Sequence, residues 1–227
     1  MTHTTSQRRL VPSYTALIFL FLVSAGWFTV VYTNQLKSVL QPLGLYALVA
    51  MLIAFIWERP VWRDAYIPTL KSIILGVIFG LIMAAATYLA YNIFIILFPS
   101  AKPEVMLLYK QLHLPPGPTR HLHWFIIVII AEEILWRGLL FSTLPLHKDN
   151  LRTGWQTQLG WLTFASLLYA LAQMGQGSLL LGLVALVCGM TWGIIRLWSQ
   201  NLITPILTHL VWDIIVLLLF PLEQLTP

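Results

Sequence analysis

Residues 70–98, LKSIILGVIFGLIMAAATYLAYNIFIILF, decide the fold of this chain, because they form a long apolar run in which Lys71 is the one charged residue. An α-helix rises 1.5 Å per residue, so about 20 residues cross a hydrocarbon core of about 30 Å. The run is longer than this, which predicts a membrane-spanning helix that tilts, projects into the interface or contains a break. Other long apolar runs lie on both sides of it.

Composition indicates a membrane protein along the whole chain. Of the 227 residues, 59% are hydrophobic and 9% are charged, whereas a soluble domain carries about 25% charged residues. The strands of a β-barrel would alternate apolar and polar residues in short segments, and the runs here are longer and more continuous. We therefore predict an all-α, polytopic transmembrane helical bundle of about seven spans. The expected spans are residues 13–33, 39–57, 70–98, 123–145, 157–174, 178–198 and 202–220.

The basic residues outside the spans predict the orientation of the chain. The net charge is +5, but the Lys and Arg residues lie in short loops, where they set topology more simply than they bind nucleic acid. With the N-terminus inside, eight of them are cytoplasmic and four lie on the opposite side. We expect a multi-pass protein of a prokaryotic inner membrane with a cytoplasmic N-terminus, surrounded by lipid and without a nucleic-acid partner.

The longest predicted loop covers residues 99–121. Five prolines bracket its partly apolar segment 104–110, and proline restricts the chain at the ends of a short helix. This pattern predicts a short interfacial helix. The sequence leaves two roles open for it, a covering segment or a lid beside a functional site.

Glu132, Glu133 and Arg137 stand in an apolar stretch, where each charged group costs about 2.5 to 3.5 kcal/mol at the centre of a spanning helix. Positions four apart on an α-helix differ by about 40°, so Glu133 and Arg137 share a face and can form an ion pair. Glu132 is rotated by about 100° and is left without this partner. Burial favours proton uptake by an unpaired carboxylate, so we interpret Glu132 as a candidate general base.

The last expected span carries a second polar pair. His209 and Asp213 are four residues apart and share a face. Histidine can donate a hydrogen bond to a developing oxyanion, and a neighbouring carboxyl group can orient its ring. The fifth span ends with Tyr169 and Gln173 at the same spacing. Taken alone, that pair is typical of an interfacial aromatic belt and indicates no function.

Taken together, these blocks resemble the CPBP family, which includes CAAX proteases and bacteriocin-processing enzymes. The family pattern is Glu-Glu-x-x-x-Arg on one span, aromatic-x-x-x-His at the end of the next and His-x-x-x-Asn on the last. The first block also has the usual context, Ala-Glu-Glu-Ile-Leu-Trp-Arg-Gly-Leu-Leu-Phe from Ala131 onward. We divide the chain into a cytoplasmic tail at residues 1–12, N-terminal transmembrane helices with the interfacial loop at 13–122, a CPBP-like catalytic core at 123–221 and a C-terminal tail at 222–227.

The resemblance implies an intramembrane endopeptidase of the glutamic type, which cleaves a membrane-anchored or hydrophobic protein or peptide. Matching positions make Glu132 the base that activates water. Glu133 and Arg137 become its supporting pair. His209 would stabilise the oxyanion, with Asp213 beside it.

Two positions depart from the family pattern. Gln173 stands where the family has histidine, and Asp213 where it commonly has asparagine. Glutamine can hydrogen-bond a water but cannot accept a proton at physiological pH. An ionised aspartate would repel an oxyanion, so Asp213 must be protonated, paired with His209 or set back from the reacting carbonyl. These departures concern activity rather than fold.

Histidine and carboxylate side chains also suit zinc or manganese. The constellation holds one histidine, and the sequence contains no His-Glu-x-x-His motif. We therefore expect no cofactor and do not favour a catalytic metal.

Two further hypotheses remain beside the peptidase. A catalytically inactive relative could keep the polar cluster as a binding network and act as a membrane scaffold or chaperone, and Gln173 favours this hypothesis. A proton-coupled transporter would use the buried ionisable groups as a relay. The absence of evident internal repeats in the sequence counts against the transporter.

Overall fold

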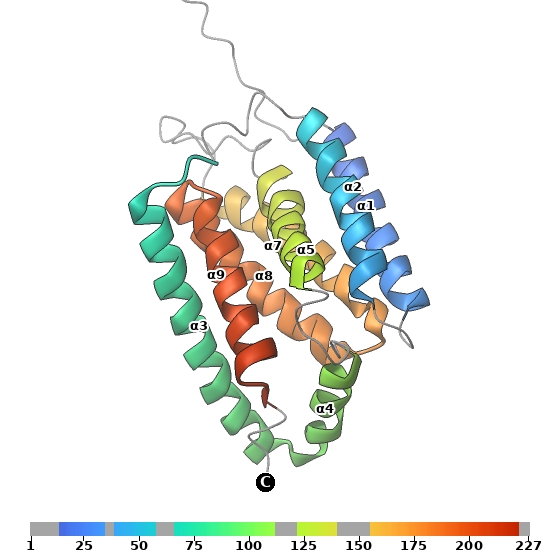
Figure 1. The fold of residues 1–227 in the computed structure, drawn as a ribbon, viewed down its shortest axis with the longest axis vertical. Helices are drawn as coiled ribbons and strands as arrows, with labels where there is room; N and C mark the ends of the chain where they lie inside the picture. The colour runs from blue at the N-terminus through green and yellow to red at the C-terminus, as the bar shows by residue number, and fades with distance from the viewer. Residues whose placement is uncertain (1–13, 35–38, 58–65, 112–121, 140–154, 223–227) are drawn as a thin grey trace, which may run out of the picture.

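The computed structural model describes residues 14–34, 39–57, 66–111, 122–139 and 155–222. Every regular element in these ranges is helical, which confirms the predicted all-α polytopic bundle (Figure 1). The α-helices are α1 (Tyr14–Thr33), α2 (Leu40–Trp57), α3 (Leu70–Leu97), α4 (Lys102–Gln111), α5 (Leu122–Glu132), α7 (Trp155–Gln173), α8 (Leu179–Ser199) and α9 (Ile203–Asp213). The short helical segments are η1 (Pro99–Ala101), η3 (Glu133–Leu139), η4 (Met174–Gln176) and η5 (Ile214–Leu219).

Each of the seven predicted spans falls on a helix, although residues 140–145 of the fourth lie outside the described residues. The third span is the single helix α3, so the break that the sequence allowed does not occur. By length and composition, three helices in the described part of the chain can cross a membrane, and two apolar helices are shorter. The three are Thr15–Thr33, Leu70–Leu97 and Leu179–Ser199, and the two are Leu40–Ile56 and Ile203–Leu219.

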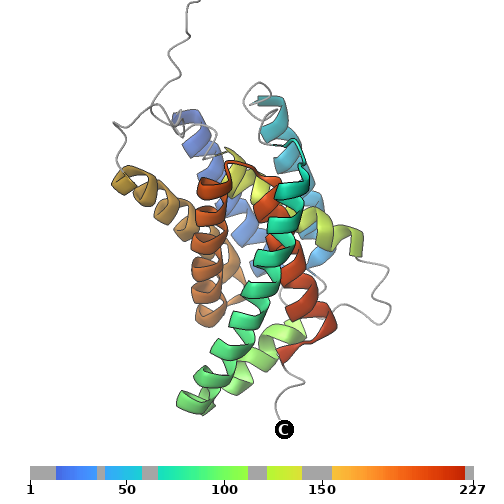
Figure 2. The same ribbon diagram turned by 90° about the vertical axis from the view of Figure 1, so that its left-hand side faces the viewer.

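α3 lies along α9 and fixes its position in the bundle (Figures 1 and 2). Gly76 allows this close approach, since a Cβ atom added there would lie 2.6 Å from Leu207 Cβ. Thr208 Oγ1 donates a hydrogen bond to the Gly76 carbonyl oxygen at 3.2 Å. Trp212 Nε1 donates another to Thr87 Oγ1 at 2.8 Å. These contacts hold the helix that carries the second predicted polar pair.

Two helices change from α- to π-helical geometry immediately after a carboxyl-bearing residue. α5 ends at Glu132 and continues as the π-helix η3, and α9 ends at Asp213 and continues as the π-helix η5. The spacing of 3.6 residues per turn that predicts the helix faces does not hold in these two segments. A π-helical segment widens the turn and re-aims the following side chains, and such segments are frequent at functional sites.

α4 confirms the predicted short helix in the longest loop, and it crosses one end of the bundle (Figure 1). The Glu104 carboxylate accepts hydrogen bonds from Ser178 Oγ at 2.9 Å and from the Leu180 N–H at 3.4 Å, at the start of α8. At the other end of α4, the Tyr109 hydroxyl donates to the Val216 carbonyl oxygen at 2.8 Å. α4 therefore joins α8 to η5, while its role as a lid stays a prediction.

Candidate active site

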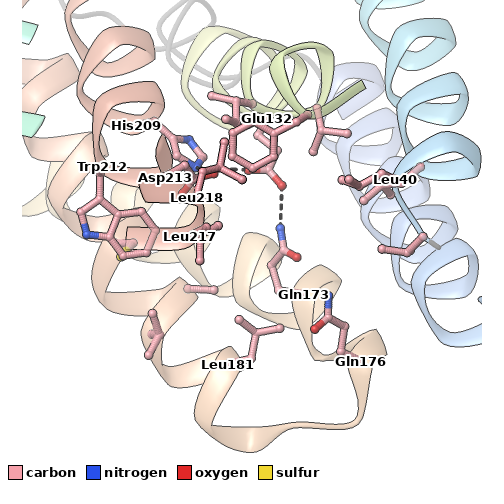
Figure 3. Close-up of a pocket in the computed structure, with 18 of the residues that line it drawn as sticks. Leu40, Glu132, Gln173, Gln176, Leu181, His209, Trp212, Asp213, Leu217 and Leu218 are labelled. Atoms are coloured by element: carbon pink, nitrogen blue, oxygen red, sulfur yellow. Dashed lines mark hydrogen bonds and ion pairs between the residues drawn. The ribbon is translucent and has the colours of Figure 1, made fainter. Parts of the chain in front are cut away.

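The structure brings the six predicted site residues into one cluster inside the bundle. Figure 3 shows four of them, Glu132, Gln173, His209 and Asp213. Five of the six are buried, and Gln173 is half-buried. They come from four segments: Glu132 ends α5, Glu133 and Arg137 lie in η3, Gln173 ends α7, and His209 and Asp213 lie on α9. Their proximity is a structural result, and their catalytic roles remain predictions.

Glu133 is the centre of the supporting contacts. Arg137 Nη1 donates to Glu133 Oε1 at 3.1 Å, so the predicted ion pair forms. The same carboxylate oxygen lies 2.9 Å from His209 Nδ1. The Arg137 guanidinium carbon also lies 4.5 Å from the centroid of the Tyr169 ring and 5.2 Å from that of Trp192, which adds cation–π attraction. These contacts offset the large cost of burying two charges away from water.

Glu132 accepts one hydrogen bond on each carboxylate oxygen. Tyr169 Oη donates to Oε2 at 2.9 Å, and Gln173 Nε2 donates to Oε1 at 2.6 Å (Figure 3). Two side chains of α7 therefore hold the Glu132 carboxylate in place. Gln173 reaches Glu132 directly, as a histidine at the same position would have been expected to do.

His209 links the two carboxyl groups that line the cavity. Its Nε2 atom lies 3.7 Å from Glu132 Oε2 and 3.6 Å from Asp213 Oδ2. The indole of Trp192 stacks on the imidazole, with ring centroids 3.6 Å apart and planes inclined by 21°. This stacking fixes the plane of the His209 ring. Asp213 lies beside His209 at a distance longer than a direct hydrogen bond, and its protonation state stays a prediction.

A cavity of about 500 Å³ reaches the cluster. Glu132, Gln173, His209 and Asp213 form its polar part (Figure 3). Gln176 also lines it, and its Oε1 atom is buried without a hydrogen-bond partner. The apolar lining includes Leu40, Leu43, Phe125, Ile129, Leu181 and Leu217. An apolar cavity with a few convergent polar groups is typical of a binding site for a largely hydrophobic ligand.

Sequence reasoning missed three residues of this site. Tyr169 shares a face with Gln173, but the sequence could not show that its hydroxyl reaches Glu132 on another helix. Gln176 follows Gln173 by three residues in the 3-10 turn η4, and that spacing is the one local signal for it. Trp192 has no sequence signal that separates it from an ordinary core tryptophan.

No three histidine, cysteine or carboxylate side chains in the described part of the chain are arranged to hold a metal ion. The site does contain four side chains of these types, Glu132, Glu133, His209 and Asp213. They form hydrogen bonds and ion pairs with one another. The expectation of a cofactor-free protein stays a prediction.

Comparison with known protein families identifies a match to part of the chain. The family model described as type II CAAX prenyl endopeptidase Rce1-like matches residues 118–215, a little under half of the chain. No curated protein and no solved structure shows significant similarity to the chain. The matched region contains all six residues of the cluster. Together with the long apolar helices of the described residues, the match indicates an integral membrane protein. Over residues 118–215, this match supports the assignment of the chain to the CPBP/CAAX protease family.

Proposed function

We propose that this protein is an intramembrane endopeptidase in which Glu132 activates water against a peptide bond. The observation that carries the proposal is the position of Glu132, whose carboxylate lies at the polar part of an apolar cavity. Two donors fix its direction, and His209 lies beside it. The family match supports the same class of activity.

The geometry fits peptide hydrolysis inside a largely apolar environment. A carboxylate held by two donors is oriented to take a proton from water, which is the task of a general base. His209 and Asp213 line the same cavity, where they can meet the carbonyl group of a bound substrate. The apolar lining fits a membrane-anchored or lipid-modified substrate segment, which can enter from the bilayer without first leaving the membrane.

The proposal is tested with the full chain reconstituted in liposomes and a farnesylated CAAX peptide that carries a fluorophore and a quencher across the expected cleavage site. We expect time-dependent fluorescence and a shortened peptide by mass spectrometry. The same peptide without its farnesyl group should be cleaved more slowly, because it lacks the apolar part that fills the cavity. Intact peptide after prolonged incubation with folded protein would contradict the proposal.

Tyr169→Phe is expected to lower kcat for this peptide about 10- to 100-fold, because a hydrogen bond to a charged acceptor contributes about 1.5 to 3 kcal/mol. The matched control is Tyr46→Phe, which removes a hydroxyl that donates to the Val23 carbonyl oxygen between α2 and α1. The two variants should lose similar stability and differ in kcat. Equal kcat values for the two would show that the Tyr169 hydroxyl has no part in catalysis.

A non-catalytic scaffold is the second candidate function, and one contact favours it. Gln173 occupies Glu132 Oε1 at 2.6 Å with a group that cannot take a proton. A scaffold predicts an intact peptide with the wild type and cleavage by Gln173→His. Cleavage by the wild type removes this candidate.

A further inference from the structure

Two carboxyl groups of the cavity flank one ring nitrogen. His209 Nε2 lies 3.6 Å from Asp213 Oδ2 and 3.7 Å from Glu132 Oε2, and all three side chains line the cavity. Both distances exceed a direct hydrogen bond, so His209 Nε2 leaves both carboxyl groups open to a bound water or substrate. Figure 3 shows Glu132 and Asp213 near the same part of the cavity. A peptide carbonyl placed there would meet two carboxyl groups.

The contacts of His209 decide which of its nitrogens carries the proton. Arg137 pairs with Glu133 Oε1, which holds Glu133 as a carboxylate, and a carboxylate only accepts hydrogen bonds. His209 Nδ1 lies 2.9 Å from that oxygen and is therefore the donor. In a neutral imidazole the other nitrogen then has a lone pair. His209 Nε2 therefore accepts a proton or a hydrogen bond. While His209 is neutral, this nitrogen cannot donate a hydrogen bond to an oxyanion.

Their surroundings distinguish the two carboxyl groups. Glu132 accepts two side-chain hydrogen bonds, which favour its ionised form. Among the described residues, no side chain donates a hydrogen bond of normal length to Asp213. Two carboxyl groups in one buried site do not readily ionise together, and the better-solvated one holds the charge. Glu132 is therefore suited to act as the general base, and a neutral Asp213 is suited to act as the general acid.

We propose, on the basis of the proposed peptidase function, that Asp213 is the general acid of a two-carboxyl dyad whose base is Glu132. Glu132 takes a proton from water while the water oxygen bonds to the scissile carbonyl carbon. The carbonyl π electrons move to its oxygen, which takes the proton of Asp213. This gives a gem-diol. Glu132 then gives its proton to the nitrogen, which leaves with the C–N electron pair, while the C=O bond re-forms and Asp213 recovers a proton from a hydroxyl group of the diol. The peptide bond and water become an acid and an amine.

This dyad accounts for both departures of the chain from the family pattern. Gln173 holds Glu132 but cannot share its proton. In the family pattern, the histidine at the position of Gln173 on α7 would be the second ionisable group. In this chain Asp213 on α9 supplies that group. Among the described residues, the titratable groups that interact with Asp213 from its own and the neighbouring helices are Glu132, Glu133, Tyr169, Cys188 and His209.

The activity test compares wild type, Asp213→Asn and Asp213→Glu in liposomes with the farnesylated peptide. Asparagine has the same shape but no acidic proton, so we expect kcat to fall by about 10² or more with KM nearly unchanged. Asp213→Glu should keep part of the activity. The rate of the wild type should fall at high pH as Asp213 loses its proton, and the residual rate of Asp213→Asn should lack this fall. An Asp213→Asn variant with the kcat and pH profile of the wild type would overturn the dyad.

Infrared spectroscopy of the substrate-free protein tests the dyad without turnover, so it separates failure of the dyad from failure of the peptidase function. We expect the C=O stretching band of a protonated carboxyl group at neutral pH in the wild type and its loss in Asp213→Asn. The control variant Glu104→Gln, which changes a carboxylate on α4, should keep the band. A band that persists in Asp213→Asn, or that is missing from the wild type, would refute the assignment.

Discussion

Glu132→Gln is expected to lower kcat for the farnesylated peptide by about 10²- to 10⁴-fold, the usual contribution of a general base. Glutamine has nearly the same size as glutamate, and its amide oxygen can still accept the hydrogen bond from Tyr169 or Gln173. What it loses is the ability to take a proton from water. The measurement is initial rates in liposomes, alongside helix content by circular dichroism and thermal stability.

Glu104→Gln is the matched control for this substitution. Glu104 lies on α4 outside the cluster, and a glutamine oxygen there can still accept the hydrogen bonds from Ser178 and Leu180. We expect this variant to cleave the peptide at close to the wild-type rate. If Glu132→Gln cleaves as fast as Glu104→Gln, Glu132 is not the base, and the hydrolytic water is activated elsewhere.

The fold could be predicted from the sequence because long apolar runs have one stable form in a membrane. Without water to satisfy the backbone, each run forms a helix, and α3 follows its run almost residue for residue. The places where helical geometry changes could not be predicted. Nothing in the sequences of Glu133–Leu139 and Ile214–Leu219 distinguishes a π-helix from an α-helix, because both segments consist mainly of apolar residues that suit either geometry.

In the candidate site, contacts within one helical segment could be predicted from the sequence, and contacts between helices could not. The pair of Glu133 and Arg137 follows from spacing on one segment, and the structure shows it at 3.1 Å. The contact between His209 and Glu133 joins positions 76 apart in the sequence, and that between Tyr169 and Glu132 joins positions 37 apart. Such contacts depend on how the helices cross, which spacing along one helix does not determine.

Arg137→Met is expected to destabilise the bundle by about 3 to 5 kcal/mol, the cost of leaving a buried charge without its partner. Glu133 is fully buried, and Arg137 is the one cation that forms an ion pair with it in the described residues, apart from His209. His209 can take a proton and replace part of the lost charge, so we expect the lower end of this range. The measurement is the free energy of unfolding from titration with a denaturing detergent.

Two further variants separate the charge from the volume of Arg137. The double variant Glu133→Gln with Arg137→Met removes both charges and should recover most of the lost stability, because a neutral amide costs much less to bury than an unpaired carboxylate. Arg196→Met removes a buried arginine that forms no ion pair with the described residues, so it should cost little. Similar losses for Arg137→Met and Arg196→Met would mean that packing, and not the ion pair, makes Arg137 important. The double variant could also recover its free energy of unfolding without recovering peptide cleavage. That result would show that the charges of Glu133 and Arg137 serve catalysis, as expected if they keep the proton on His209 Nδ1 beside the cavity.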